Sequence, residues 1–322
     1  MKQRLIILSF LVSLAIMGAK FYAYYASGST TLLTDALESI VNVVAAAFAY
    51  YSIYLASQPR DLNHPYGHGK IEFFASGLEG VLILLAAMYI FLHAWQHLYA
   101  RPELKSLDLG IIISISSAAV NGILGYYLVS QGKSSHSPAI LADGKHLKLD
   151  ALNGVFVVVA LVITYVTNLF WIDSIASLIF ASVMCWQGLN LIREAIAALM
   201  DETNPEVFQK VIQWIVSNKK QEWIDLHNLR VIKYGALMHI DCHLTVPWYF
   251  NVNEAHAAVD EFTKLIKNKF GDSVEFFVHT DGCMPFSCAI CTIENCEKRN
   301  APFKEKLAWN RENVLSDLKH QL

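Results

Sequence analysis

Charged residues are scarce in this chain. Of its 322 residues, 16% are aspartate, glutamate, lysine or arginine, whereas 54% are hydrophobic. Ordinary soluble domains carry about 25% charged residues. The shortage is also uneven, because residues 1–200 hold the long apolar runs and residues 201–322 hold most of the charge. This distribution argues against a single soluble domain and predicts a membrane region followed by a soluble one.

Several functional signatures are also missing. The net charge of −3 leaves no basic excess for binding nucleic acid. The sequence contains no glycine-rich phosphate-binding loop and no recognisable Ser-His-Asp arrangement. We therefore expect neither an enzyme nor an ATP-driven pump, and no nucleic-acid partner.

Six apolar stretches are long enough to cross the roughly 30 Å of hydrocarbon in a lipid bilayer. They lie near residues 5–26, 31–56, 72–98, 107–131, 147–167 and 171–194. The first follows two cations, as in a signal peptide, but lacks a convincing small-residue cleavage site, so we expect it to be retained. The sequence thus predicts a six-helix transmembrane domain over residues 1–200.

The basic residues that flank these stretches gather on one side of the predicted bundle: Lys2, Arg4, Arg60, Lys70, Lys133, Lys145 and Lys148. Arg101 and Lys105 are the exceptions on the other side. Because lysine and arginine favour cytoplasmic loops, we expect both termini to be cytoplasmic, in an inner or plasma membrane.

Two pairs of polar residues interrupt the apolar stretches. Glu38 and Asn42 are four residues apart in the second, and His146 and Asp150 are four apart at the start of the fifth. Residues at this spacing share one face of a helix. Each pair alone can be a satisfied polar contact between helices. Ionisable groups at membrane depth usually mark an ion pathway, however, and the two pairs together can form a four-ligand metal site.

A second candidate site lies in the loop after the second stretch. Asp61, His64 and His68 fall within a turn-forming segment, and three nitrogen or oxygen donors so close together can hold Zn²⁺ or a similar ion. The alternative is a loop whose histidines make structural hydrogen bonds.

The region after residue 203 changes character. Its pattern predicts a helix over 206–217, strands over 225–231 and 237–246, a helix over 253–270 capped by Asn253, and a strand over 274–279. This α-β-β-α-β order predicts an α+β domain over residues 204–282, with two helices on one face of a three-stranded sheet.

Together these features resemble the cation diffusion facilitator family of divalent-metal transporters. The resemblance rests on Leu33-Thr-Asp-Ala-Leu-Glu-Ser, Asn63-His-Pro-Tyr-Gly-His-Gly-Lys-Ile-Glu72, Ala142-Asp-Gly-Lys-His and the α+β domain. It implies a metallochaperone-like cytoplasmic domain, a homodimer, and export of a divalent cation in exchange for protons.

The resemblance also implies ligands. The family's transport site matches Glu38, Asn42, His146 and Asp150, but its usual second-helix pair is His or Asp followed by Asp. Asn42 replaces an anionic ligand with a neutral amide, which leaves Fe²⁺, Mn²⁺ and Co²⁺ open although zinc is the first expectation. Asp35, one turn before Glu38, can assist. The loop group matches a cytoplasmic site, and a dimer-bridging regulatory site is similar to a further set: His227, His243, His256, His279 and Asp281.

The C-terminal tail, residues 283–322, lies beyond the resemblance. It contains Cys283, Cys288, Cys291 and Cys296, whose close spacing is typical of a thiolate site for Zn²⁺ or Cu(I). The alternative is that the cysteines form a redox-reactive or incidental cluster. The pattern of residues 304–322 predicts a polar helix. For the whole chain, the rival to a transporter is a membrane metal sensor or scaffold that works through its soluble domain.

Overall fold

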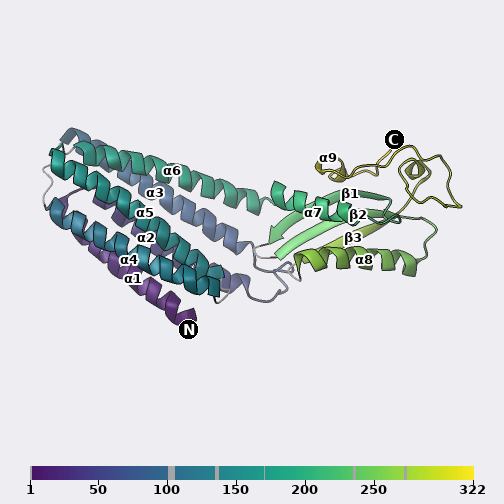
Figure 1. The fold of residues 1–322 in the computed structure, drawn as a ribbon, viewed down its shortest axis with the longest axis horizontal. Coiled ribbons are helices and arrows are strands. Elements are labelled where there is room, and N and C mark those ends of the chain that lie inside the picture. Colours follow the sequence, from purple (N-terminus) through teal and green to yellow (C-terminus); the bar gives the residue numbers. More distant parts are fainter. Residues whose placement is uncertain (1, 101–105, 135–137, 170, 235–236, 272–273) are drawn as a thin grey trace. The chain divides into compact units, whose positions relative to one another are not determined.

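The computed structural model describes the chain apart from residues 1, 101–105, 135–137, 170, 235–236 and 272–273 (Figure 1). Arg101 and Lys105, the exceptions to the charge asymmetry, therefore lie outside the described residues. The chain divides into two compact units. One contains residues 1–52 and 74–195, and the other contains residues 53–73 and 196–322.

Six long helices carry the apolar sequence: α1 (Lys2–Ser27), α2 (Thr30–Ala56), α3 (Ile71–Ala100), α4 (Leu107–Ser134), α5 (Pro138–Thr167) and α6 (Trp171–Leu199). Each contains a segment long and apolar enough to cross a membrane, which confirms the six predicted spans. Helix α5 begins at Pro138, before the predicted residue 147, because the turn that contains Asp143, Lys145 and His146 is helical too, and hydropathy detects only the part suited to hydrocarbon.

Helices α4 and α5 approach each other closely where two glycines face across the contact. A Cβ atom added to Gly144 would lie only 2.6 Å from the backbone nitrogen of Val129. The same addition at Gly125 would lie 2.9 Å from the carbonyl oxygen of Gly144. Small residues at such crossings allow the backbones of membrane helices to pack directly. This contact holds α5 in place two residues before His146.

The start of α2 is held by Asp173 of α6. Its carboxylate accepts hydrogen bonds from the Ser29 hydroxyl (2.5 Å), the Thr30 amide (2.7 Å) and the Thr30 hydroxyl (2.8 Å). The first amides of a helix have no partner within the helix, so a buried carboxylate satisfies them and fixes the helix end. The position of α2, and with it Glu38 and Asn42, depends on this contact.

The second unit contains the predicted α-β-β-α-β order: α7 (Pro205–Ser217), β1 (Asp225–Tyr234), β2 (Leu237–Val246), α8 (Val252–Phe270) and β3 (Val274–Gly282). The sheet order is β1-β2-β3, with β1 antiparallel and β3 parallel to β2. The predicted cap Asn253 is wrong. Asn251 caps α8 instead, because its side chain accepts from the Glu254 amide (3.0 Å) while Glu254 accepts from the Asn251 amide (2.8 Å).

One apolar core joins the helices to one face of the sheet. Phe208 and Ile215 of α7 and Phe262 of α8 are fully buried against Ile240 and Leu244 of β2. Side chains alternate between the two faces of a strand, so the polar residues between these positions point to the opposite face. The opposite face of the sheet carries the histidines.

The strand register places three histidines side by side. His227 of β1 is paired with His243 of β2, which is paired with His279 of β3. Strand β3 extends to Gly282, beyond the predicted end at residue 279, and this extension brings Asp281 opposite Thr245. These histidines and Asp281 thus form a row of potential metal ligands on one face of the sheet.

The tail is mostly irregular. It contains the 3-10 helix η1 (Pro285–Ala289) and the single turn α9 (Arg311–Val314), so the predicted helix over residues 304–322 is wrong. The tail is held by tertiary contacts instead, because Trp309 and Val314 are buried in the core of the second unit. The Asn228 amide also donates to the carbonyl oxygen of Ser316 at 2.7 Å.

Candidate metal-binding sites

Within the first unit, three of the four predicted transport ligands meet between α2 and α5. The Asn42 amide nitrogen lies 3.5 Å from each carboxylate oxygen of Asp150. The His146 Nε2 atom lies 3.7 Å from the nearer oxygen of the same carboxylate. The contact between Asn42 and Asp150 joins residues 108 positions apart in the sequence, and His146 lies four residues before Asp150, so an amide and an imidazole lie beside one carboxylate.

Glu38 lies beside this group through a different partner. Its carboxylate accepts a hydrogen bond from the side-chain amide of Asn153 at 2.9 Å. Asn153 follows Asp150 by three residues on α5, and Glu38 precedes Asn42 by four on α2, so the two contacts lie on adjacent turns. All four predicted ligands therefore lie along the facing stretches of α2 and α5. Asn153 was not predicted.

A buried ion pair stands next to these residues. Lys20 of α1 lies 2.8 Å from the carboxylate of Asp35 and 3.0 Å from the Ser39 hydroxyl, and both charged side chains are almost fully buried. Lys20 also interacts electrostatically with Glu38 and Asp150. Asp35, which the sequence suggested as an assisting ligand, is thus neutralised by Lys20. The sequence signal that could have identified this ion pair is the lone lysine within an apolar span.

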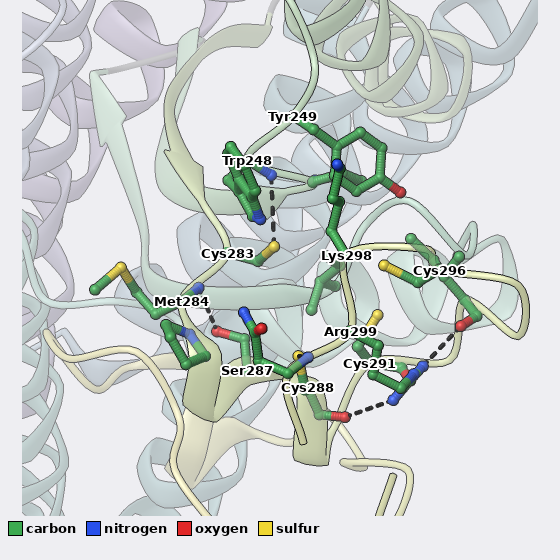
Figure 2. A pocket seen from close by; sticks show the side chains of 15 residues that line it. Trp248, Tyr249, Cys283, Met284, Ser287, Cys288, Cys291, Cys296, Lys298 and Arg299 are labelled. Atoms are coloured by element: carbon green, nitrogen blue, oxygen red, sulfur yellow. Dashed lines mark hydrogen bonds between the residues drawn. The ribbon is translucent and has the colours of Figure 1, made fainter. Parts of the chain in front are cut away.

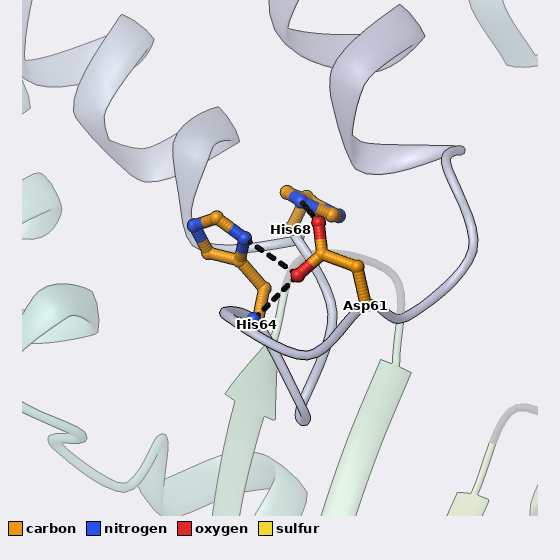
Figure 3. A group of neighbouring side chains, drawn as sticks. All are labelled: Asp61, His64 and His68. Atoms are coloured by element: carbon orange, nitrogen blue, oxygen red, sulfur yellow. Dashed lines mark hydrogen bonds and ion pairs between the residues drawn. The ribbon is translucent and has the colours of Figure 1, made fainter.

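The predicted loop group forms a compact cluster in the second unit, shown in Figure 3. The carboxylate of Asp61 lies 3.0 Å from His64 Nδ1 and 3.4 Å from His68 Nε2. It also accepts a backbone hydrogen bond from His64, which is the main cause that lowers the pKa of Asp61. One ligand atom from each residue lies within 4.8 Å of the others, a spacing suited to a metal ion.

A second group of this kind lies on the histidine face of the sheet. Asp281 Oδ2 lies 3.5 Å from His227 Nε2 and 3.3 Å from His243 Nδ1. This oxygen is buried and has no hydrogen-bond partner among the described residues. Burial, together with the neighbouring His227 and His279, lowers the pKa of His243 and favours the neutral imidazole that a metal requires. The donor set therefore suits a divalent cation.

The remaining two members of the predicted set lie farther out. His279 stacks beside His243, with ring centroids 4.5 Å apart, and its Nε2 atom lies 3.9 Å from Asp281. His256 lies on α8, is largely exposed, and pairs with Asp260 one turn later at 3.7 Å. The structure brings His279 next to the sheet group and does not bring His256 into it.

The end of the tail contacts the same acids. The Lys319 ammonium lies 3.1 Å from Asp281 Oδ1, and His320 Nδ1 lies 2.7 Å from Asp225. Burial opposes the charge on Asp225, but hydrogen bonds from His227 and His320 outweigh it and keep the pKa of this carboxyl well below its ordinary range. The Lys319 ammonium thus contacts one oxygen of Asp281, while the other oxygen, Oδ2, faces His227 and His243. Sequence reasoning missed this contact because Lys319 is 38 residues beyond Asp281 in an irregular segment.

The predicted tail cysteines also come together. Cys283, Cys288, Cys291 and Cys296 line one pocket, shown in Figure 2. Cys242 does not belong to this group. It is buried in the core of the sheet, where desolvation raises the pKa of its thiol far above the ordinary range.

Comparison with known proteins covers both units. Residues 6–200 match the model of the cation efflux transmembrane domain, and residues 204–283 match that of the cation efflux protein cytoplasmic domain. An uncharacterized transporter of Synechocystis sp. is 37% identical over 267 residues, which cover 83% of this chain and 86% of the relative.

Two more distant relatives have more specific names. The manganese efflux system protein MneP of Bacillus subtilis is 23% identical, over 87% of this chain and 95% of its own. The cation-efflux pump FieF of Shewanella oneidensis is 25% identical, over 84% and 90% respectively. With both domains matched and six apolar helices present, this integral membrane protein belongs to the cation efflux, or cation diffusion facilitator, family of metal transporters.

Proposed function

We propose that this protein exports a divalent metal cation from the cytoplasm in exchange for protons, and that Glu38, Asn42, His146 and Asp150 are its transport ligands. The observation that carries the proposal is the meeting of Asn42, His146 and Asp150 between two apolar helices. Polar groups at this depth are costly unless they serve an ion, and family membership supports cation export.

The charges around the site support exchange of one divalent ion for two protons. Lys20 is paired with Asp35, and the four proposed ligands contain two carboxylates, those of Glu38 and Asp150. A divalent cation balances these two charges. After its release, two protons can restore neutrality at the same carboxylates, so protons and metal compete for one set of ligands. Alternating access to the site would then couple the two movements.

The donor set accepts more than one metal. Three of the four ligands offer oxygen and one offers nitrogen, whereas thiolates are absent from the four residues. Zinc is our first candidate. Oxygen-rich sites also suit Mn²⁺ and Fe²⁺, and one relative bears the name of a manganese efflux protein.

We assign a regulatory role to the cytoplasmic groups. The loop group of Asp61, His64 and His68 and the sheet group of His227, His243 and Asp281 each present three ligand atoms within 4.8 Å. In a homodimer, metal binding to the associated state would stabilise it. We expect the full-length protein to dimerise more tightly with Zn²⁺ than with chelator, which analytical ultracentrifugation in detergent can measure. Equal dimerisation constants would remove the regulatory assignment.

The test of transport uses purified protein in sealed vesicles with a pH-sensitive dye inside. Addition of Zn²⁺, Mn²⁺, Fe²⁺ or Co²⁺ should produce metal uptake accompanied by opposite proton movement. The isosteric variant Asp150→Asn should lose both, whereas Cys185→Ser, on α6 and outside the described ligand groups, should keep both. A wild-type protein that binds metal without moving metal or protons would instead be a sensor or scaffold.

A further inference from the structure

Four cysteines from one short segment converge on a single pocket. Cys283 directly follows β3, Cys288 lies in η1, and Cys291 and Cys296 lie in the loop after it. All four line a pocket of about 310 Å³, and Figure 2 shows their sulfur atoms around a common space. The cysteines are separated by four, two and four residues. Each interval falls within the two to four residues typical between zinc-binding cysteines.

The backbone around the pocket donates hydrogen bonds to sulfur. The Trp248 amide donates to Cys283 Sγ and the Asn300 amide donates to Cys288 Sγ, each at 3.4 Å. Tyr249 lines the same pocket as Cys296. Hydrogen bonds to the charged form of an acid favour that form. The two backbone donors would therefore stabilise thiolates at Cys283 and Cys288.

Arg299 closes the loop around the pocket. Its guanidinium donates to the carbonyl oxygens of Cys288 (2.9 Å), Cys291 (3.1 Å) and Ile293 (2.7 Å). Lys298 also lines the pocket. Four thiolates and one Zn²⁺ carry a net charge of −2, which these two neighbouring cations balance. An ordinary apolar cluster of cysteines would have no need of paired cations at its edge.

We propose that Cys283, Cys288, Cys291 and Cys296 form a tetrathiolate site for Zn²⁺. All four thiols are free. Among the described residues, no three of these sulfur atoms lie within 4.8 Å of one another, so binding would draw them inward. Each cysteine has one rotatable side-chain bond, and the ligands come from a short segment, so little entropy is lost on closure.

The proposed site has a structural consequence for the tail. It would hold the segment that joins β3 to the anchored residues Trp309 and Val314, and thereby the path that brings Lys319 to Asp281. Because a thiol must lose its proton to ligate a metal, Zn²⁺ binding to this site should release protons. The proposal does not depend on transport, because the pocket contains none of the transport ligands.

The test uses the full-length protein, purified in detergent under anaerobic conditions. Metal analysis should find one Zn²⁺ per chain more in the wild type than in Cys288→Ser/Cys291→Ser. Co²⁺ in place of Zn²⁺ should give intense sulfur-to-cobalt charge-transfer absorption, which sites made only of histidine and carboxylate lack. Cys185→Ser is the matched control and should keep both signals. Vesicle transport should persist in the double variant, which separates this site from the transport proposal.

Two measurements on the wild type keep the test valid even if the double variant misfolds. In the folded protein, Cys283, Cys288, Cys291 and Cys296 should resist alkylation with Zn²⁺ bound and react more after chelation, whereas the buried Cys242 should be protected in both states. Absence of sulfur-to-cobalt absorption, or equal alkylation of the folded protein with and without Zn²⁺, would overturn the proposal. A disulfide among the four in the anaerobic protein, or iron with acid-labile sulfide in place of Zn²⁺, would overturn it as well.

Discussion

Replacement of Asn42 by aspartate tests the transport site most directly. The Asn42 amide nitrogen lies 3.5 Å from both oxygens of Asp150, so the substitution places a second carboxylate against the first without changing side-chain size. The favourable amide contact is lost and a repulsion replaces it. The four proposed ligands then include three carboxylates, where Glu38 and Asp150 alone were two.

The energy of this repulsion can be calculated from the distance between the two side chains. Two unit charges about 3.5 Å apart repel by about 5 kcal/mol at an effective dielectric constant of about 20. Side-chain movement will relieve part of it, but relief of about 1.5 kcal/mol by a bound cation would still tighten binding roughly tenfold. Binding of a proton relieves the same repulsion, so the variant should release more protons per metal bound. The added anionic donor should favour Zn²⁺ over Mn²⁺.

The assay measures metal affinity and proton release in detergent at a series of pH values, and metal ranking in vesicles. Asn42→Asp should bind Zn²⁺ about tenfold more tightly at alkaline pH, with a steeper pH dependence than the wild type. Asn42→Ala removes the amide without adding charge and should weaken binding. If the metal ranking and the pH profile of Asn42→Asp match the wild type, the side chain points away from the ion and the assigned site is wrong.

Three further predictions concern the charged contacts. Asp150→Ala should abolish vesicle transport while size-exclusion chromatography still shows the wild-type oligomer, and wild-type uptake would contradict the site. Lys20→Met should reduce the free energy of unfolding by about 3–5 kcal/mol, because it leaves Asp35 buried and unpaired, and Lys20→Met/Asp35→Leu should restore most of it. Thermal unfolding in detergent measures both, and a double variant no more stable than the single would refute the pairing. Lys319→Ala should tighten Zn²⁺ binding near Asp281 about fivefold, because it removes a competing contact worth about 1 kcal/mol. Calorimetry in an Asp150→Ala background measures this affinity. An unchanged affinity would show that Lys319 does not compete with the metal.

Sequence periodicity was sufficient for the elements and for pairs of donors within one helix. Spans of about 20 apolar residues are recognisable because the hydrocarbon thickness demands that length. The pairs Glu38–Asn42 and His146–Asp150 were recognisable because residues four apart share a helix face. The order of helices and strands in the second unit followed from the same local signals.

Local signals did not reveal which faces meet. The Lys20–Asp35 pair, the Asn153 contact to Glu38 and the docking of Lys319 on Asp281 join residues on separate elements. The polar composition of the tail predicts a helix, whereas the structure contains only the single turn α9 there, because Trp309 is buried in the core instead.

The sequence by itself determined the membrane region, the soluble α+β domain and the chemical types of the donors. The tertiary structure decided how those donors combine. Strand register alone aligns His227, His243 and His279, since a shift of one residue would turn the row into the apolar core. Helix packing alone brings Asn42 to Asp150. The strand register and the helix packing both depend on contacts between distant segments, and no local sequence pattern determines the energies of such contacts.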